Sequence, residues 1–275
     1  MFRSVSLYYL IACGWAWLAF APVIFGTQGL KLIPITAPLP VFACIASLGP
    51  FFGCFGAYRV EYGNWRAVHL LPSNFSRSMW LLFGPSLILL TMFAIFPALL
   101  SRCAPAGWHW KPSVLLGIWV PMFNYNLLGG PLFEEFGWRG FLLPRLQREM
   151  APSLAAIVVG FMWAVWHFPL FLVSWSSASP FTYTFMMIGI SMVFAYAFNA
   201  SGGSVLVTIL MHSAFNASPR FFDPYLGSTP TRDHPSEGVL LGLSFLLIAV
   251  IITALTCGRL GFKGSSGVQE REARG

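Results

Sequence analysis

The chain has 275 residues, of which 57% are hydrophobic and only 9% are charged. Soluble domains carry about a quarter of charged residues, so this composition excludes an ordinary soluble protein. The net charge of +7 does not indicate nucleic-acid binding, because the basic residues lie singly between apolar stretches and form no stripe. Bases at the ends of apolar spans are typical of membrane topology instead. We therefore predict an integral protein of the cell membrane that contacts the lipid bilayer and no nucleic acid.

Apolar stretches long enough to cross a bilayer follow one another along most of the chain. A transmembrane helix needs about 20 mostly apolar residues. This criterion predicts an all-α, polytopic bundle of about eight transmembrane helices, at residues 5–26, 39–58, 79–100, 113–133, 153–173, 181–199, 203–217 and 239–257. The fourth span has a polar continuation to residue 148, and the seventh is short. We expect one membrane domain over residues 1–257 and a disordered, polar, glycine-rich tail over residues 258–275.

The distribution of basic residues predicts the topology. The first apolar run is long enough to span, and Pro22 follows the nearest small-x-small site, so we expect a retained helix and no cleaved signal peptide. Eight spans place both termini on one side of the membrane. Ten Lys and Arg residues would then lie on that side and five on the other, which favours cytoplasmic termini.

Few ionisable residues lie next to or inside the predicted spans. Of nine acidic residues, only Glu134 and Glu135 abut an apolar span, and of five histidines only His167 and His212 lie inside one. An ionisable group at membrane depth is costly and marks a functional site by default. These four residues are therefore the first candidates for chemistry.

The segment around the two glutamates contains a helix-breaking sequence. Gly129 and Gly130 precede Pro131, which suits the first position of a new helical turn. Glu135 and Arg139 are four residues apart, so on a helix they share a face and can form an ion pair. Glu134 points about 100° away from that face, which is the rotation per residue of an α-helix. A simpler interpretation is that both glutamates mark an interfacial helix end.

Each histidine taken alone has a structural explanation. His167 could be a hydrogen-bonded packing residue of an apolar helix. His212 and Asn216 are four residues apart and face one way, so the pair could simply bond helices together. Because such residues occur in several consecutive inner spans, we favour a functional site.

Taken together, these residues resemble a known family. Three motifs occur in order over residues 130–217: Glu134-Glu135-x-x-x-Arg139, Trp163-x-x-x-His167 and His212-x-x-x-Asn216. They resemble the CPBP intramembrane glutamic endopeptidases, which include the CAAX prenyl endopeptidases and the bacterial Abi bacteriocin-immunity proteins. Trp163 stands where many members carry Phe.

The resemblance implies a hydrolase and a role for each motif residue. Glu134 and His167 would activate a water molecule, and His212 with Asn216 would stabilise the oxyanion. Glu135 and Arg139 would support the site. It implies a protease that needs no metal or other cofactor and cuts a membrane-associated peptide or protein, with or without a lipid anchor. We expect the site to open toward the cytoplasmic half of the membrane.

Several alternatives stay open. The chain has no HExxH, no aspartate inside a span, and no glycine two residues before Ser201 as a GxSG serine protease would need. Two glutamates with two histidines could still bind a metal ion. Buried Glu and His residues also suit a proton-coupled transporter, although the other half of the chain has no matching helix break. A catalytically idle immunity protein with a peptidase fold is the third alternative.

Overall fold

The computed structural model describes residues 2–62, 75–88, 127–173, 179–217 and 235–264, and over these residues it is helical without strands. The predicted fold class is therefore confirmed. The long helices are α1 (Phe2–Phe25), α2 (Leu39–Tyr62), α9 (Pro152–His167), α10 (Pro180–Ala200), α11 (Val205–Ala217) and α13 (Pro235–Leu255). The shorter elements are α3 (Phe75–Ser78), α6 (Leu127–Gly129), α7 (Pro131–Gly137), the π-helical turn η2 (Trp138–Leu142), α8 (Leu143–Leu146) and the 3₁₀ turn η3 (Phe168–Val173).

Six of the eight predicted spans coincide with these long helices. Within the described residues, four segments are long and apolar enough to cross a membrane: Arg3–Phe25, Leu39–Glu61, Pro152–Val173 and Pro180–Ala200. Val205–Ala217 and Gly242–Leu255 are shorter apolar helices, which agrees with the short seventh span. Residues 80–88 are helical within the third predicted span, but most of the third and fourth spans lies outside the described residues.

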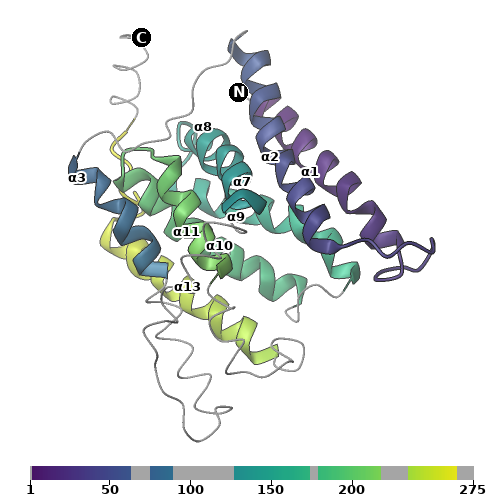
Figure 1. Ribbon diagram of the computed structural model, residues 1–275. Coiled ribbons are helices and arrows are strands. Elements are labelled where there is room, and N and C mark those ends of the chain that lie inside the picture. Colours follow the sequence, from purple (N-terminus) through teal and green to yellow (C-terminus); the bar gives the residue numbers. More distant parts are fainter. Residues whose placement is uncertain (1, 63–74, 89–126, 174–178, 218–234, 265–275) are drawn as a thin grey trace, which may run out of the picture.

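Helices α1 and α2 form an antiparallel pair along one flank of the bundle, whereas α10 and α13 pack together on the other (Figure 1). Small residues bring the first pair close. A Cβ atom added at Gly49 would lie 2.5 Å from the Ala12 carbonyl oxygen, and one added at Gly53 would lie 2.6 Å from that of Tyr8. Such close backbone approach is how transmembrane helices gain packing contacts without a hydrophobic driving force.

The C-terminal segment packs against one end of the bundle, which we call the tail end. The Ser153 backbone N–H, at the start of α9, donates to the Gly258 carbonyl at 3.2 Å. Near the end of α10, Asn199 Nδ2 donates to the carbonyl of Leu260 at 2.9 Å, and the Leu260 side chain is fully buried. The packed part of the chain therefore continues three residues beyond the predicted boundary at residue 257.

Helix α1 runs parallel to α9 and so also begins at the tail end. Tyr9 Oη donates to the Met162 carbonyl at 3.0 Å, and farther along both helices Trp17 Nε1 donates to the Trp166 carbonyl at 3.2 Å. Because α2 is antiparallel to α1, α2 ends at the tail end. These directions fix where each site residue lies along the bundle.

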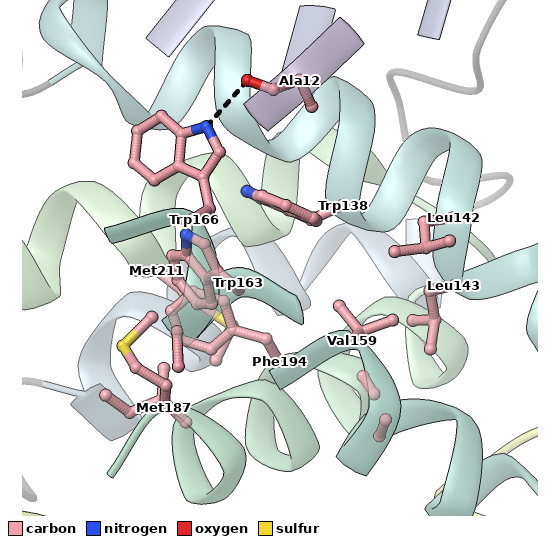
Figure 2. Packing of buried hydrophobic residues seen from close by; sticks show 14 of the residues in the cluster. Ala12, Trp138, Leu142, Leu143, Val159, Trp163, Trp166, Met187, Phe194 and Met211 are labelled. Atoms are coloured by element: carbon pink, nitrogen blue, oxygen red, sulfur yellow. Dashed lines mark hydrogen bonds between the residues drawn. The ribbon is translucent and has the colours of Figure 1, made fainter. Parts of the chain in front are cut away.

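A layer of apolar side chains fills part of the bundle interior (Figure 2). Its members come from η2, α8 and α9, and none has any exposed surface. We call this set the apolar layer: Trp138, Phe141, Leu142, Leu143 and Val159. In sequence, η2 and α8 directly follow the two glutamates, so the layer lies between these carboxylates and the tail end.

Candidate active site

Helix α7 begins where the sequence predicts a break. Helix α6 ends at Gly129, and α7 starts with Pro131 at its first position. Glu134 therefore lies in the first turn of α7, and its carboxylate is almost completely buried. A Cβ atom at Gly130 would lie only 3.1 Å from Glu134 Oε1. A glycine before the proline thus leaves room for the carboxylate.

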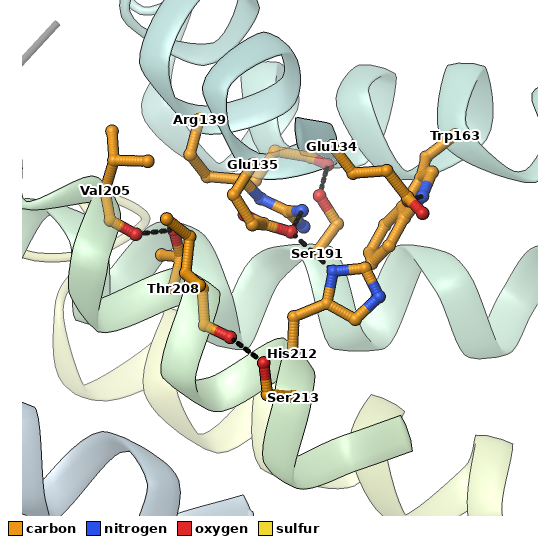
Figure 3. A network of polar contacts seen from close by, with 11 residues as sticks. Glu134, Glu135, Arg139, Trp163, Ser191, Val205, Thr208, His212 and Ser213 are labelled. Atoms are coloured by element: carbon orange, nitrogen blue, oxygen red, sulfur yellow. Dashed lines mark hydrogen bonds and ion pairs between the residues drawn. The ribbon is translucent and has the colours of Figure 1, made fainter. Parts of the chain in front are cut away.

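Glu135 forms the predicted ion pair with Arg139. Arg139 Nη1 lies 2.7 Å from Glu135 Oε1, and both side chains are fully buried (Figure 3). The guanidinium carbon lies 4.4 Å from the centre of the Trp163 ring and 4.9 Å from that of Phe194. Cation–π contacts of this kind help to offset the loss of hydration. The π-helical turn that begins at Trp138 contains Arg139, and such turns are common beside functional sites.

Trp163 connects the other glutamate to the first histidine. Its indole Nε1 donates to Glu134 Oε2 at 2.9 Å, and its own carbonyl oxygen lies 2.9 Å from His167 Nδ1. A carbonyl oxygen only accepts, so His167 Nδ1 carries the hydrogen. In the neutral ring, Nε2 of His167 is then the nitrogen that can accept a proton. One tryptophan therefore orients both groups that the resemblance assigns to water activation.

His212 contacts the ion pair, a contact that the sequence analysis did not predict. His212 Nδ1 lies 3.0 Å from Glu135 Oε1, and its ring packs edge-on against Trp163 at 5.0 Å between centroids. An ionised carboxylate only accepts, so Nδ1 carries the hydrogen. Donation from Nε2 to an oxyanion then requires the imidazolium, whose charge Glu135 would stabilise.

Asn216 is a predicted site residue that does not take part in these contacts. It lies one turn beyond His212 near the end of α11, its side chain is exposed, and the contacts among the described residues do not join it to the others. His167, the last residue of α9, is half-buried. The more accessible site residues therefore lie away from the tail end, where α1 begins. The direction in which the site opens and the side of the termini both stay predictions.

Helix α1 also supports the site, although the first spans carry no motif. The Tyr8 ring packs edge-on against Trp138 at 5.7 Å between centroids, and it lies tilted by 31° against Phe141 at 5.0 Å. A Cβ atom at Gly137 would lie 2.6 Å from Tyr8 Oη. The only sequence signal for this role is a tyrosine within an apolar span, because its hydroxyl favours a polar neighbour.

Metal binding was a possibility for two glutamates and two histidines. Among the described residues, no group of three or more His, Cys, Asp and Glu side chains is arranged to hold a metal ion. Oxygen and nitrogen ligands of a tetrahedral zinc ion would have to converge on one point. The absence of a metal requirement stays a prediction.

Comparisons with known proteins agree with the motifs. Residues 115–218 match the family model described as type II CAAX prenyl endopeptidase Rce1-like. The CAAX prenyl protease 2 of Methanococcus maripaludis is 42% identical over 55 residues, which are 20% of this chain and 20% of that protein. Lysostaphin resistance protein A of Staphylococcus epidermidis is 33% identical over 127 residues, or 44% of this chain and 32% of that protein. Lysostaphin resistance protein A of Staphylococcus haemolyticus is 27% identical over 143 residues, which are 50% of this chain and 38% of that protein.

These matches confirm the predicted resemblance to the CPBP and CAAX endopeptidases over the segment that contains the three motifs. The chain spans between a fifth and two fifths of the length of these curated relatives.

Proposed function

This chain carries an Rce1-like CAAX endopeptidase segment at residues 115–218, and on that premise we propose that it is an intramembrane endopeptidase. The observation that best supports the proposal is that Trp163 bonds both groups. Its indole N–H donates to the buried Glu134 carboxylate, and its carbonyl oxygen accepts from the His167 ring. Arg139 forms its ion pair with Glu135. Glu134 instead accepts the hydrogen bond of the Trp163 indole, which places its carboxylate beside the residue that also holds His167.

The proposed reaction is direct hydrolysis by water. Glu134, with His167 as its neighbour, takes a proton from a water molecule while the oxygen attacks the scissile carbonyl carbon. His212 as imidazolium and Asn216 as a neutral amide donate to the resulting oxyanion. When the intermediate collapses, the C–N bond breaks and the proton passes from Glu134 to the departing amine. A carboxylic acid and an amine leave, and no covalent enzyme intermediate forms.

The substrate class that we propose is a membrane-associated polypeptide, with or without a lipid anchor. The test is a proteolysis screen in which the purified protein meets lipidated and unlipidated peptides in detergent or liposomes. Cleavage that is lost on changing Glu134 supports the proposal. Proton-coupled transport by reconstituted protein without any cleavage would favour the transporter alternative, and neither activity would favour an idle immunity protein.

The proposed mechanism predicts activity without a metal ion. Water is activated by Glu134 and His167, so exhaustive dialysis against a chelator should leave turnover largely intact. Elemental analysis of the pure protein should find no stoichiometric zinc. A loss of turnover that added zinc restores would instead support a metallopeptidase.

The indole of Trp163 should affect how Glu134 titrates. Trp163→Phe removes the N–H that stabilises the ionised carboxylate, a hydrogen bond of about 1.5–3 kcal/mol. The other ionisable groups that face Glu134 include Glu135, Arg139 and His212, and they stay in place. Since the base must be ionised, we expect the acid limb of the pH–turnover profile to move up by about one to two pH units.

Trp166→Phe is the matched control on the same helix. Trp166 also loses a buried hydrogen bond, but its indole donates to the Ala12 carbonyl at 3.2 Å and not to the site. The acid limb of the pH–turnover profile of Trp166→Phe should stay in place, even if this variant unfolds at a lower temperature. An unmoved acid limb in Trp163→Phe would show that the indole does not act on the base.

A further inference from the structure

We propose that Tyr183 of α10 is a further positioning residue of the active site, whose ring holds the His167 imidazole in the orientation that water activation needs. The catalytic part of this inference rests on the proposed peptidase function, in which His167 assists Glu134. The packing part rests on contacts between α9 and α10 and can be measured without any cleavage. None of the three motifs contains Tyr183, so it was not among the predicted site residues.

His167 lies where its own helix ends. It is the last residue of α9, and the chain continues from Phe168 as the 3₁₀ turn η3. Pro169 lacks the N–H that an α-helix would donate to the Val165 carbonyl, and this carbonyl accepts from the Phe168 N–H instead. Hydrogen-bond geometry in such a turn is poorer than in an α-helix. A half-buried imidazole at this point therefore depends on its side-chain neighbours to keep one orientation.

Three aromatic rings contact the His167 ring. The Trp166 ring packs edge-on against it at 4.5 Å between centroids, and the Trp163 ring lies tilted at 6.2 Å. Both tryptophans belong to α9 and so move together with His167. The third ring is that of Tyr183, which packs edge-on at 5.5 Å and comes from α10. Of these three rings, Tyr183 is thus the one that fixes the imidazole relative to another helix.

Tyr183 is itself held in place by the start of α10. The helix begins with Pro180 after the N-cap residue Ser179. Ser179 Oγ accepts from the Thr182 N–H at 3.1 Å, and the Ser179 carbonyl accepts from the Tyr183 N–H at 2.9 Å. The Tyr183 ring also packs edge-on against Phe171 at 5.5 Å, and the residue is buried. A capped first turn and a buried ring give the tyrosine a defined position from which to restrain its neighbour.

Tyr183 also lies near the proposed base. Its hydroxyl interacts electrostatically with Glu134 of α7, so the tyrosine is close to both groups that would activate water. Its contact with His167 is made by the ring, which restricts the imidazole but exchanges no proton with it. This contact assigns Tyr183 to positioning. Small displacements of a catalytic group can cost about 10²-fold in rate, so such a restraint matters for turnover.

The packing part is tested by nuclear magnetic resonance of ¹⁵N-histidine-labelled protein in detergent, purified without a histidine tag. The chain has five histidines, and His167→Gln identifies the signals of His167. We expect a single tautomer with the hydrogen on Nδ1, which donates to the Trp163 carbonyl at 2.9 Å. Tyr183→Leu removes the restraining ring, so both tautomers of His167 should appear. Tyr183→Phe keeps the ring and should keep the single tautomer.

Tyr196→Leu is the matched control on the same helix, because the Tyr196 ring packs against Trp80 at 5.5 Å and not against the site. It should leave the His167 signals unchanged, even if the variant unfolds at a lower temperature. A single Nδ1–H tautomer in folded Tyr183→Leu protein would overturn the inference. Should Tyr183→Leu fail to fold, Tyr183→Met takes its place with the same two outcomes, since methionine adapts to irregular core spaces but has no ring.

The catalytic part is tested on the peptide found by the proteolysis screen. Tyr183→Leu should lower kcat by about 10²-fold and leave KM unchanged, because it misplaces a catalytic group and removes no contact with substrate. Tyr183→Phe should lower kcat by less than about 10-fold, the effect of one uncharged hydrogen bond. Tyr196→Leu should change neither constant. A raised KM at unchanged kcat in Tyr183→Leu would assign Tyr183 to substrate binding and overturn the positioning role.

The two measurements separate this inference from the proposed function. If the His167 signals respond as expected while the purified protein cleaves no peptide, the proposed function fails and the restraint of the imidazole by Tyr183 stands. If the peptide is cleaved and folded Tyr183→Leu protein cleaves it at the normal rate, the proposed function stands and Tyr183 is not a positioning residue.

Discussion

Glu134→Gln is expected to abolish turnover while the protein folds normally. Glutamine keeps the size of the side chain and an oxygen that can accept the Trp163 N–H, but it cannot take a proton from water. Loss of one acid–base group costs about 10²–10⁴-fold in rate, and we expect more because the same carboxylate orients the water. Turnover of the peptide found by the proteolysis screen measures the loss, and the unfolding temperature in detergent measures the fold.

Glu149→Gln is the matched control, because it makes the same chemical change at an exposed position after α8. Both its turnover and its unfolding temperature should stay at the level of the unmodified protein. If Glu134→Gln turns over normally while Glu135→Gln is folded and inactive, the roles of the two glutamates are reversed.

Local spacing predicted the parts of the site that depend on one helix. The pairing of Glu135 with Arg139 followed from four-residue spacing and is confirmed at 2.7 Å. The helix break followed from the backbone restrictions of Gly-Gly-Pro, and α7 does begin at Pro131. Most of the described spans followed from hydropathy, because a bilayer fixes the length of an apolar helix.

Contacts between helices were beyond this reasoning. The bond of His212 to Glu135 joins residues 77 positions apart, and only the packing of α11 against α7 brings them together. The indole of Trp163 was noted as a departure from Phe, but its N–H to Glu134 depends on how α9 faces α7.

Breaking the Glu135–Arg139 pair should cause the largest loss of stability. Glu135→Gln leaves a fully buried guanidinium without its ion-pair partner, beside the rings of Trp163 and Phe194 and a neutral amide. Removing one partner of a buried ion pair costs about 3–5 kcal/mol, because the other charge is left uncompensated. Arg139→Gln should cost a similar amount. We expect both variants to unfold at markedly lower temperature in detergent and to lose activity partly through misfolding.

The double change Glu135→Gln with Arg139→Gln should cost less than the sum of the two single changes, because the charge that either single change leaves without its ion-pair partner is then absent. Arg148→Gln and Glu149→Gln are the matched controls, since these residues are exposed and such surface changes usually stay within about 0.5 kcal/mol. Strictly additive costs in the thermal unfolding cycle would show that the two residues stabilise the bundle independently. In that case His212, which bonds the same Glu135 oxygen at 3.0 Å, would be the partner that keeps this carboxylate charged inside the membrane domain.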